Sequence, residues 1–215
     1  MRRVGVYTQD FKFYHDVIKI LRAWSIPFVS LDHPHAFSKD VVVVLSSSKD
    51  ADYGSLQERF DDPKAAVRYS FPRLVGKSAF NLVVVGIDPG PRPGLAVVCD
   101  NILTEAMECP TIEDLSNEVE EIVSQYLCRD LVIRIGNGDR PNRESIIRSL
   151  ADLNVMLYQV DETGTTIRYR NDNNAISAAK IALAVSIPDG QAKKRKNERS
   201  FVERNFVTIR GVLSS

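Results

Sequence analysis

The sequence has little of what several classes of protein require. Its 215 residues include three cysteines and three histidines, and no CxxC pair or Cys–His cluster indicates a zinc site. The 28 basic and 28 acidic residues cancel, so net charge gives no general attraction to nucleic acid or to a membrane. No segment approaches the roughly 20 apolar residues of a membrane span. The first residues also lack a signal-peptide core. We therefore expect a cytoplasmic protein that makes no membrane contact.

The few metal- and redox-competent side chains are scattered. Cys99, Cys109 and Cys128 lie in or beside apolar segments, which predicts free thiols that are buried or half-buried. His33 and His35 flank a proline in an expected loop. No third ligand stands near this histidine pair, so the sequence favours a loop over a metal site there.

The first third of the chain alternates between strand and helix patterns. Asp10 can cap a helix that follows a short strand at 4–7. Apolar residues then recur at helical spacing, and they are Phe11, Tyr14, Val17, Ile18 and Leu21. Further β-rich segments at 26–31 and 41–45 are expected strands. Together these patterns predict a small α/β domain over residues 1–75. The basic, proline-interrupted segment 64–77 is expected to connect it to the next domain.

Residues 76–186 carry the pattern of a second domain. Strands are expected at 82–87, 95–99 and 102–107, and short turns between them favour antiparallel pairing. Two helix–strand crossovers follow, with strands at 131–135 and 155–160, helices that begin at 111 and at Asn142, and a last helix opened by Asp172 to Asn174 with a small-residue surface. The sequence thus predicts an α/β fold with a mixed sheet, three antiparallel strands and then parallel crossovers. Residues 187–215 are expected to form a basic C-terminal segment.

Four acidic residues stand where strands end or a helix begins, namely Asp88, Asp139, Glu162 and Asp172. A two-metal nuclease needs carboxylates that converge from different strand ends and that hold Mg²⁺ through oxygen. Each residue also has a plainer interpretation. Asp-Pro-Gly is ordinary turn chemistry, Asp is a preferred helix cap, and Glu162 lies in a polar loop.

Short motifs around these residues resemble a known superfamily. The segments 85–90, 135–138, 160–166 and 174–179, in this order, resemble the RuvC/YqgF branch of the RNase H-like superfamily. Ile135-Gly136-Asn137-Gly138 is similar to the YqgF-type domain of Tex-like transcription accessory proteins. The resemblance covers residues 81–183 and implies an RNase H-like fold.

The same resemblance implies metal-dependent phosphodiester hydrolysis on structured DNA or RNA. Asp88, Glu162 and Asp172 would hold Mg²⁺ or Mn²⁺, and Asp139 would assist. Asn174 stands where the family pattern has its last carboxylate, and an amide offers one neutral oxygen in place of an anion. The alternative prediction is therefore a catalytically degenerate domain that binds nucleic acid or a protein partner.

Other features bear on a polyanionic partner. Thr165 and Thr166 can contact phosphate through hydroxyl and backbone groups. A basic cluster follows the last expected helix, formed by Lys193, Lys194, Arg195, Lys196 and Arg199. Such a run is either a solvated linker or a phosphate-binding segment. The expected partner is DNA or RNA, and a homodimer is left open. A nucleotide-binding ATPase of the actin, Hsp70 and sugar-kinase type is disfavoured, because it needs two such domains.

Overall fold

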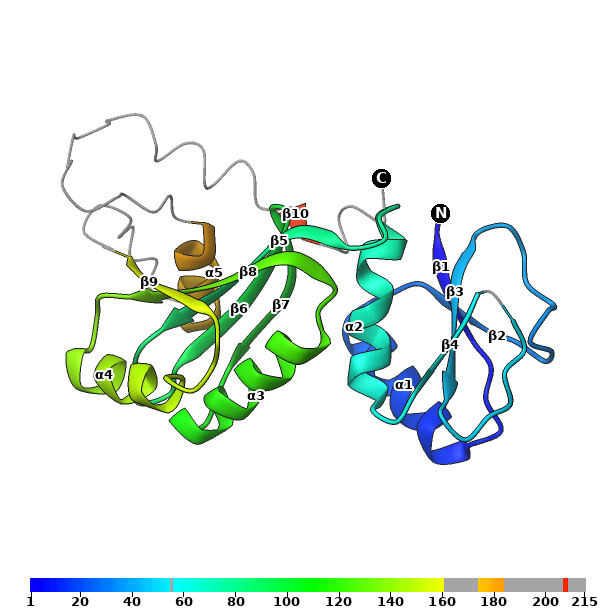
Figure 1. The fold of residues 1–215 in the computed structure, drawn as a ribbon, viewed down its shortest axis with the longest axis horizontal. Coiled ribbons are helices and arrows are strands. Elements are labelled where there is room, and N and C mark those ends of the chain that lie inside the picture. Colours follow the sequence, from blue (N-terminus) through cyan, green and yellow to red (C-terminus); the bar gives the residue numbers. More distant parts are fainter. Residues whose placement is uncertain (55, 161–173, 184–206, 209–215) are drawn as a thin grey trace. The chain divides into compact units, whose positions relative to one another are not determined.

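The computed structural model describes residues 1–54, 56–160, 174–183 and 207–208 (Figure 1). Among them, Met1–Ala79 form one compact unit with the short segment Gln125–Leu127, and this is unit 1. The other described residues from Phe80 onward form unit 2. Both units combine helices with a sheet, so the general α/β class predicted from the sequence is confirmed.

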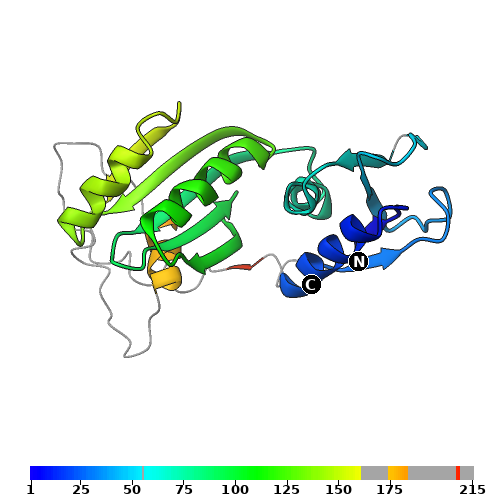
Figure 2. The same cartoon turned by 90° about the horizontal axis from the view of Figure 1, so that it is seen from below.

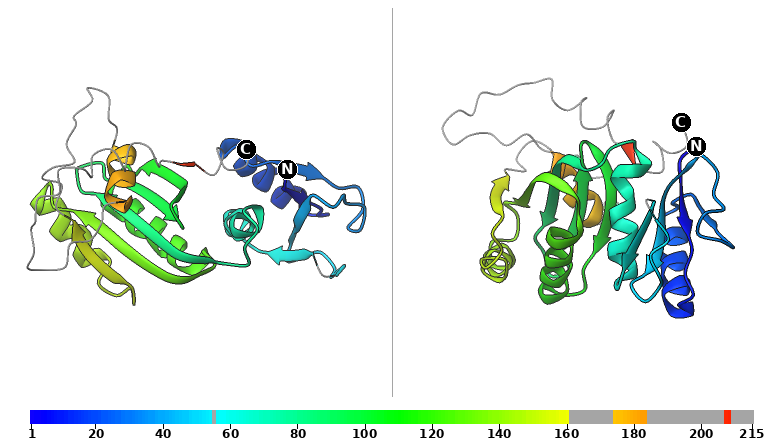
Figure 3. Two further views of the ribbon diagram at one scale, coloured as in Figure 1. Left: turned by 90° about the horizontal axis from the view of Figure 1, so that it is seen from above. Right: turned by 45° about the vertical axis from the view of Figure 1, so that its right-hand side comes forward.

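Unit 1 is a four-stranded parallel sheet with two helices. Its elements in chain order are β1 (Arg3–Val6), α1 (Phe11–Ala23), β2 (Phe28–Ser30), β3 (Val41–Ser47), β4 (Gln57–Phe60) and α2 (Pro63–Leu74). The sheet order is β2-β1-β3-β4, and every neighbouring pair is parallel. The two helices pack on each other and on β3, so they share one face of the sheet (Figure 3). Val41, Val43 and Val44 of β3 are buried because this strand is central.

Helix α1 begins where the sequence predicts. The Asp10 carboxylate accepts the backbone N–H groups of Lys12 and Phe13, at 3.1 and 3.2 Å, as an N-cap should. The predicted inward face is partly wrong, however. Phe13 is buried, whereas Phe11 is 89% exposed. Phe11 is the first helical residue and lies two positions, or about 200°, from Phe13.

The prediction that residues 64–77 form a connector is wrong. Most of this segment belongs to α2, whose N-cap is Asp62 and whose first residue is Pro63, a favoured first helical position. Phe71 is fully buried in it. Pro72 lies near the end of the helix, so it removes a single hydrogen bond and does not prevent the preceding turns. Strand β4, just before α2, was also not predicted, because its polar sequence does not show an apolar run.

Unit 2 contains a six-stranded mixed sheet and three helices among the described residues. Its elements are β5 (Phe80–Asp88), β6 (Gly94–Cys99), β7 (Ile102–Glu108), α3 (Ile112–Gln125), β8 (Cys128–Gly136), α4 (Arg140–Ser149), β9 (Met156–Val160), α5 (Asn174–Leu183) and β10 (Val207–Thr208). The sheet order is β10-β7-β6-β5-β8-β9. Strands β5, β6 and β7 are antiparallel neighbours, and β8 and β9 are parallel to β5. These strands and their directions match the pattern expected from the sequence.

Helix α5 lies directly on the sheet, on the face opposite α3 and α4 (Figure 2). A Cβ at Gly86 would collide with the Ala178 carbonyl and with Ala182, and one at Gly94 would collide with the Asn174 carbonyl. The alanines of α5 complete this close approach, because Ala175, Ala178, Ala179 and Ala182 are all buried. The small-residue packing surface predicted for this helix is therefore confirmed. Ile176 of the same helix is 43% exposed and is not part of that surface.

Two smaller predictions can be settled in unit 2. Helix α4 is capped by Asp139, three residues before the predicted cap at Asn142. All three cysteines are free thiols as predicted, with Cys99 and Cys109 buried and Cys128 half-buried. Burial raises the pKa of the Cys99 thiol far above its ordinary value, so this cysteine is kept as an uncharged core residue.

Candidate functional site

The strand order of the sheet of unit 2 reverses at β5, which is its switch point. From β5 the chain passes through β6 and β7 on one side, and it then returns to β8 and β9 on the other. Strands β5 and β8 are parallel neighbours, so their carboxyl ends meet at the same edge. In open α/β sheets, ligands bind outside the carboxyl ends of strands at such a switch point. Asp88 is the last residue of β5, and Gly136 is the last residue of β8.

Asp88 shares a row of the sheet with a second carboxylate. It is paired with Gly94 of β6, and Gly94 is paired with Glu108 of β7. Paired residues of neighbouring strands project to the same face of a sheet, so both acidic side chains project to the face that carries α5. The first turn of α5 rests on Gly94, between them. Sequence analysis missed Glu108, because only the hairpin register places it in this row.

The start of α5 is bound to the turn that follows Asp88. The Asn174 side chain donates a hydrogen bond from Nδ2 to the Arg92 carbonyl oxygen, at 2.5 Å. The Arg92 guanidinium in turn lies 3.8 Å from the Glu108 carboxylate. The site on this edge therefore combines two carboxylates, one arginine and the amino-terminal end of a helix, which favours negative charge.

Asp139 follows the end of β8 by three residues, but its side chain caps helix α4. Its Oδ1 accepts the backbone N–H of Asn142 at 3.2 Å, and its Oδ2 accepts the Asn142 side chain at 2.8 Å. Arg143 holds the preceding loop by donating to the Asn137 carbonyl oxygen at 2.5 Å. The capping interpretation of Asp139 is thus the one that its contacts support.

The other predicted site residues lie outside the described part of the chain. They are Glu162, Thr165, Thr166, Asp172, Lys193, Lys194, Arg195, Lys196 and Arg199. Within the described residues, no group of three or more His, Cys, Asp or Glu side chains is arranged to hold a metal ion. Of the three predicted metal ligands, Asp88 alone belongs to the described residues, which do not supply a complete set.

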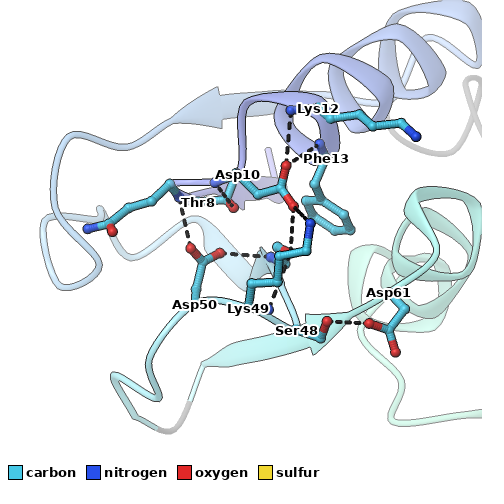
Figure 4. A network of polar contacts seen from close by, with 10 residues as sticks. Thr8, Asp10, Lys12, Phe13, Ser48, Lys49, Asp50 and Asp61 are labelled. Atoms are coloured by element: carbon cyan, nitrogen blue, oxygen red, sulfur yellow. Dashed lines mark hydrogen bonds and ion pairs between the residues drawn. The ribbon is translucent and has the colours of Figure 1, made fainter.

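Unit 1 has a switch point of its own, between β1 and β3. The loops that leave these two strands are joined by a network of polar contacts (Figure 4). Asp50 is 7% exposed, and its carboxylate accepts the backbone N–H groups of Gln9 at 2.8 Å and Ser47 at 2.9 Å. The Lys49 ammonium donates to Asp10 at 2.7 Å.

Residues 3–74 match the family model of a response regulator receiver-like domain. The match runs from β1 to the end of α2, so unit 1 is hereafter called the receiver-like unit. It covers 72 of the 215 residues, about a third of the chain. Comparison with curated proteins gave no match.

The predicted membership of the RuvC/YqgF branch is wrong for this chain. The family model that matches is the receiver-like one, and it lies in the part of the sequence that the analysis left without a family. The four motifs that carried the prediction are short. Where the structure describes them, they coincide with the ends of β5, β8 and β9 and with the start of α5, where Asp, Asn and Gly are common for local reasons.

The polar network of the receiver-like unit was not found by sequence analysis. Lys49 and Asp10 are 39 residues apart, and they meet only because β1 and β3 are neighbours in the sheet. The Lys49 ammonium and the Phe13 N–H lower the pKa of Asp10 from 3.8 to about 2. The Asp10 hydrogen bond also raises the pKa of Lys49. The Asp10–Lys49 ion pair is therefore present at neutral pH and helps to hold the two loops together.

No helix among the described residues of either unit is long and apolar enough to cross a membrane.

Proposed function

We propose that the protein acts on nucleic acid, and that unit 2 is a metal-dependent phosphodiester hydrolase for structured DNA or RNA. The observation that carries the proposal is the position of Asp88, at the carboxyl end of a central strand and beside the switch point of the sheet. A carboxylate there suits an oxygen-coordinated Mg²⁺ or Mn²⁺. Such ions orient the attacking water and stabilise the leaving oxygen of a phosphodiester.

The fold of unit 2 is part of the proposal. We infer an RNase H-like mixed sheet for it, on the support of the strand order and directions. Three antiparallel strands are followed by two parallel strands on the other side of β5. Fold alone does not establish chemistry, so the function rests on Asp88 and on its surroundings.

The metal site in this proposal is held by Asp88, Glu162 and Asp172. Asp88 alone of these belongs to the described residues, and its geometry fits the role. Asp139 would have to give up its contacts with Asn142 to assist. We therefore assign Asp139 the capping of α4 and not the binding of metal.

A second candidate is a nucleic-acid-binding scaffold that has lost hydrolysis. Asn174 favours it, because a neutral amide at the start of α5 donates to a backbone carbonyl where a carboxylate would add charge for a cation. In this version the edge that carries Arg92 contacts phosphate without cleaving it, and the basic segment 193–199 adds to binding.

The two candidates differ in turnover. The purified full chain is incubated with Mn²⁺ and a panel of labelled substrates, namely branched DNA, single-stranded DNA, hairpin RNA and linear duplex. If unit 2 is a hydrolase, at least one structured substrate is cleaved, and cleavage stops when EDTA is added. The scaffold predicts salt-sensitive binding and intact substrates. A chain that binds none of these substrates at low salt contradicts both.

We also propose that the receiver-like unit regulates unit 2. A match to a response regulator receiver-like domain supports a role for this unit in controlling unit 2, with Asp10, Lys49 and Asp50 as the residues that hold its loops. Replacing Asp50 with Ala would free the Gln9 and Ser47 N–H groups. The expected result is altered cleavage or binding by an otherwise folded chain, and unchanged activity would contradict this role.

A further inference from the structure

The outer face of α1 carries an exposed aromatic ring beside a row of cations. A groove of about 460 Å³ is lined by Phe11, Tyr14, His15, Ile18, Lys19 and Arg22. All six lie on the chain's first helix. The face belongs to the receiver-like unit and is separate from the polar network described above.

The apolar surface of this face is concentrated in one ring. Ile18 is 7% exposed, and Tyr14 is half-buried with its hydroxyl bonded to Ser30 at 2.6 Å. Phe11, by contrast, is 89% exposed. A partner helix would need several exposed apolar positions along the groove. A single free ring is instead suited to stacking against one planar group.

The charges on this face are nearly all positive. Lys12, Lys19 and Arg22 are exposed, and with the exposed imidazole of His15 they recur every three or four residues, about 4.5–6 Å apart along the helix axis. In a duplex the phosphates of one strand repeat about every 3.4 Å along the helix axis, and they separate further when the strand is extended. Asp16, the acidic residue of α1, is bound to His15 at 3.1 Å.

The presence of a lysine at position 12 is not explained by the stability of α1. It lies in the first turn of α1, where a cation opposes the positive end of the helix dipole. Its backbone N–H is bound to Asp10, but its side chain extends away from the polar network (Figure 4). Arg22, in the last turn, has a favourable position for the helix itself.

The geometry points to a binding site for single-stranded nucleic acid on the outer face of α1, in which Phe11 stacks on a base and Lys12, Lys19 and Arg22 contact phosphates. The site extends the proposed function to the receiver-like unit, but it requires no metal and no cleavage. Stacking on an aromatic ring and contact with phosphates together are how proteins bind single strands without reading their sequence.

The stacking contact is tested by anisotropy titration of a labelled oligo(dT) with the full chain in EDTA. Phe11→Ala is expected to weaken binding about tenfold or more, since the loss of one base stack has that scale. Phe11→Trp should keep the affinity, and its fluorescence should be quenched on binding. A short duplex of equal charge should bind both variants alike. Equal affinity of Phe11→Ala and the wild-type chain for oligo(dT) would overturn the proposal.

The charged contacts are tested with a matched pair of variants. Lys19→Glu and Lys39→Glu each reverse one exposed lysine of the same unit, but only Lys19 lies on α1. Lys19→Glu should reduce the dependence of log affinity on log salt by about 0.7, the value for one phosphate contact on a single strand. Lys39→Glu should leave it unchanged, and unfolding by circular dichroism should show that both variants are folded.

The outcomes separate this site from the proposed hydrolase. Reduced oligo(dT) binding by Phe11→Ala and Lys19→Glu supports the α1 site even when the chain cleaves nothing. Cleavage by a chain whose binding neither substitution changes overturns the α1 site and leaves the hydrolase standing. Binding of an acidic amphipathic peptide to this face, with no binding of oligo(dT), would also overturn it.

Discussion

Asp88 and Glu108 lie on either side of Gly94 in one row of the sheet of unit 2. With two strand spacings between them, their backbones are about 9–10 Å apart. The missing side chain at Gly94 lets the first turn of α5 approach the sheet between the two carboxylates. The position of α5 therefore depends on Gly94, which has no side chain. The shape of the candidate site depends on it in turn.

A side chain at Gly94 should damage this arrangement. Gly94→Val would drive a Cβ into the Asn174 carbonyl, and overpacking of this kind costs about 1–3 kcal/mol. We expect a lower urea midpoint and reduced activity at the site. Gly90→Ala is the control, because a Cβ at Gly90 meets nothing within 4 Å. If both variants unfold alike, α5 does not depend on the close approach.

Asn174→Asp should strengthen the candidate metal site. The substitution adds an anion at the start of α5, where the helix dipole favours it, and the number of charged ligands tunes divalent-cation affinity. We expect Mn²⁺ activation at about tenfold lower concentration. Asn174→Ala removes the hydrogen bond to Arg92 without adding charge, so it should not share the gain. Equal Mn²⁺ dependence of all three proteins would argue against a cation beside α5.

Asp139→Ala should destabilise unit 2 by removing the N-cap of α4. The expected loss is about 0.5–2 kcal/mol, measured by urea unfolding. Asp139→Ser should restore most of the stability, because serine is also a good cap. Activity should follow the same order if Asp139 only caps the helix. A serine variant that is stable yet inactive would instead assign Asp139 a direct part in the chemistry.

The pH dependence of unfolding should report on the Asp10–Lys49 pair. The pKa of Asp10 falls from 3.8 to about 2 on folding. Stability from this group is therefore fully present above pH 4 and is lost as the pH falls toward 2. The difference in melting temperature between the wild type and Asp10→Asn should shrink over that range. Lys49→Met should shrink it at all pH values. A difference that grows on acidification would contradict this contact.

Much of the fold could be predicted from local patterns. Apolar β-branched segments mark β3, β5 and β8 because these central strands are buried, and Asp10 marks the start of α1. Helix α2 was missed because its two prolines and basic residues suggested a linker. Asp62 followed by Pro63 was the available signal, since it is a typical start of a helix.

The sites could be predicted only in part. Asp88 follows its strand directly, so sequence order was enough to find it. Glu108 joins it through a hairpin register, and Lys49 meets Asp10 through the neighbouring positions of β1 and β3. Neither contact has a local signal. Phe11 fitted the apolar periodicity of α1 and still lies outward, because a first-turn residue can satisfy the pattern without reaching the core.

Asp88→Asn tests the central claim most directly. The variant is compared with Asp152→Asn, which changes an exposed aspartate after α4. Cleavage of labelled branched DNA or hairpin RNA is measured in Mn²⁺, and binding is measured in EDTA. A metal-dependent hydrolase predicts that Asp88→Asn abolishes cleavage while binding without metal is retained, and that Asp152→Asn cleaves like the wild type. Cleavage by Asp88→Asn at the wild-type rate, or none by the wild-type chain, would contradict the proposed function.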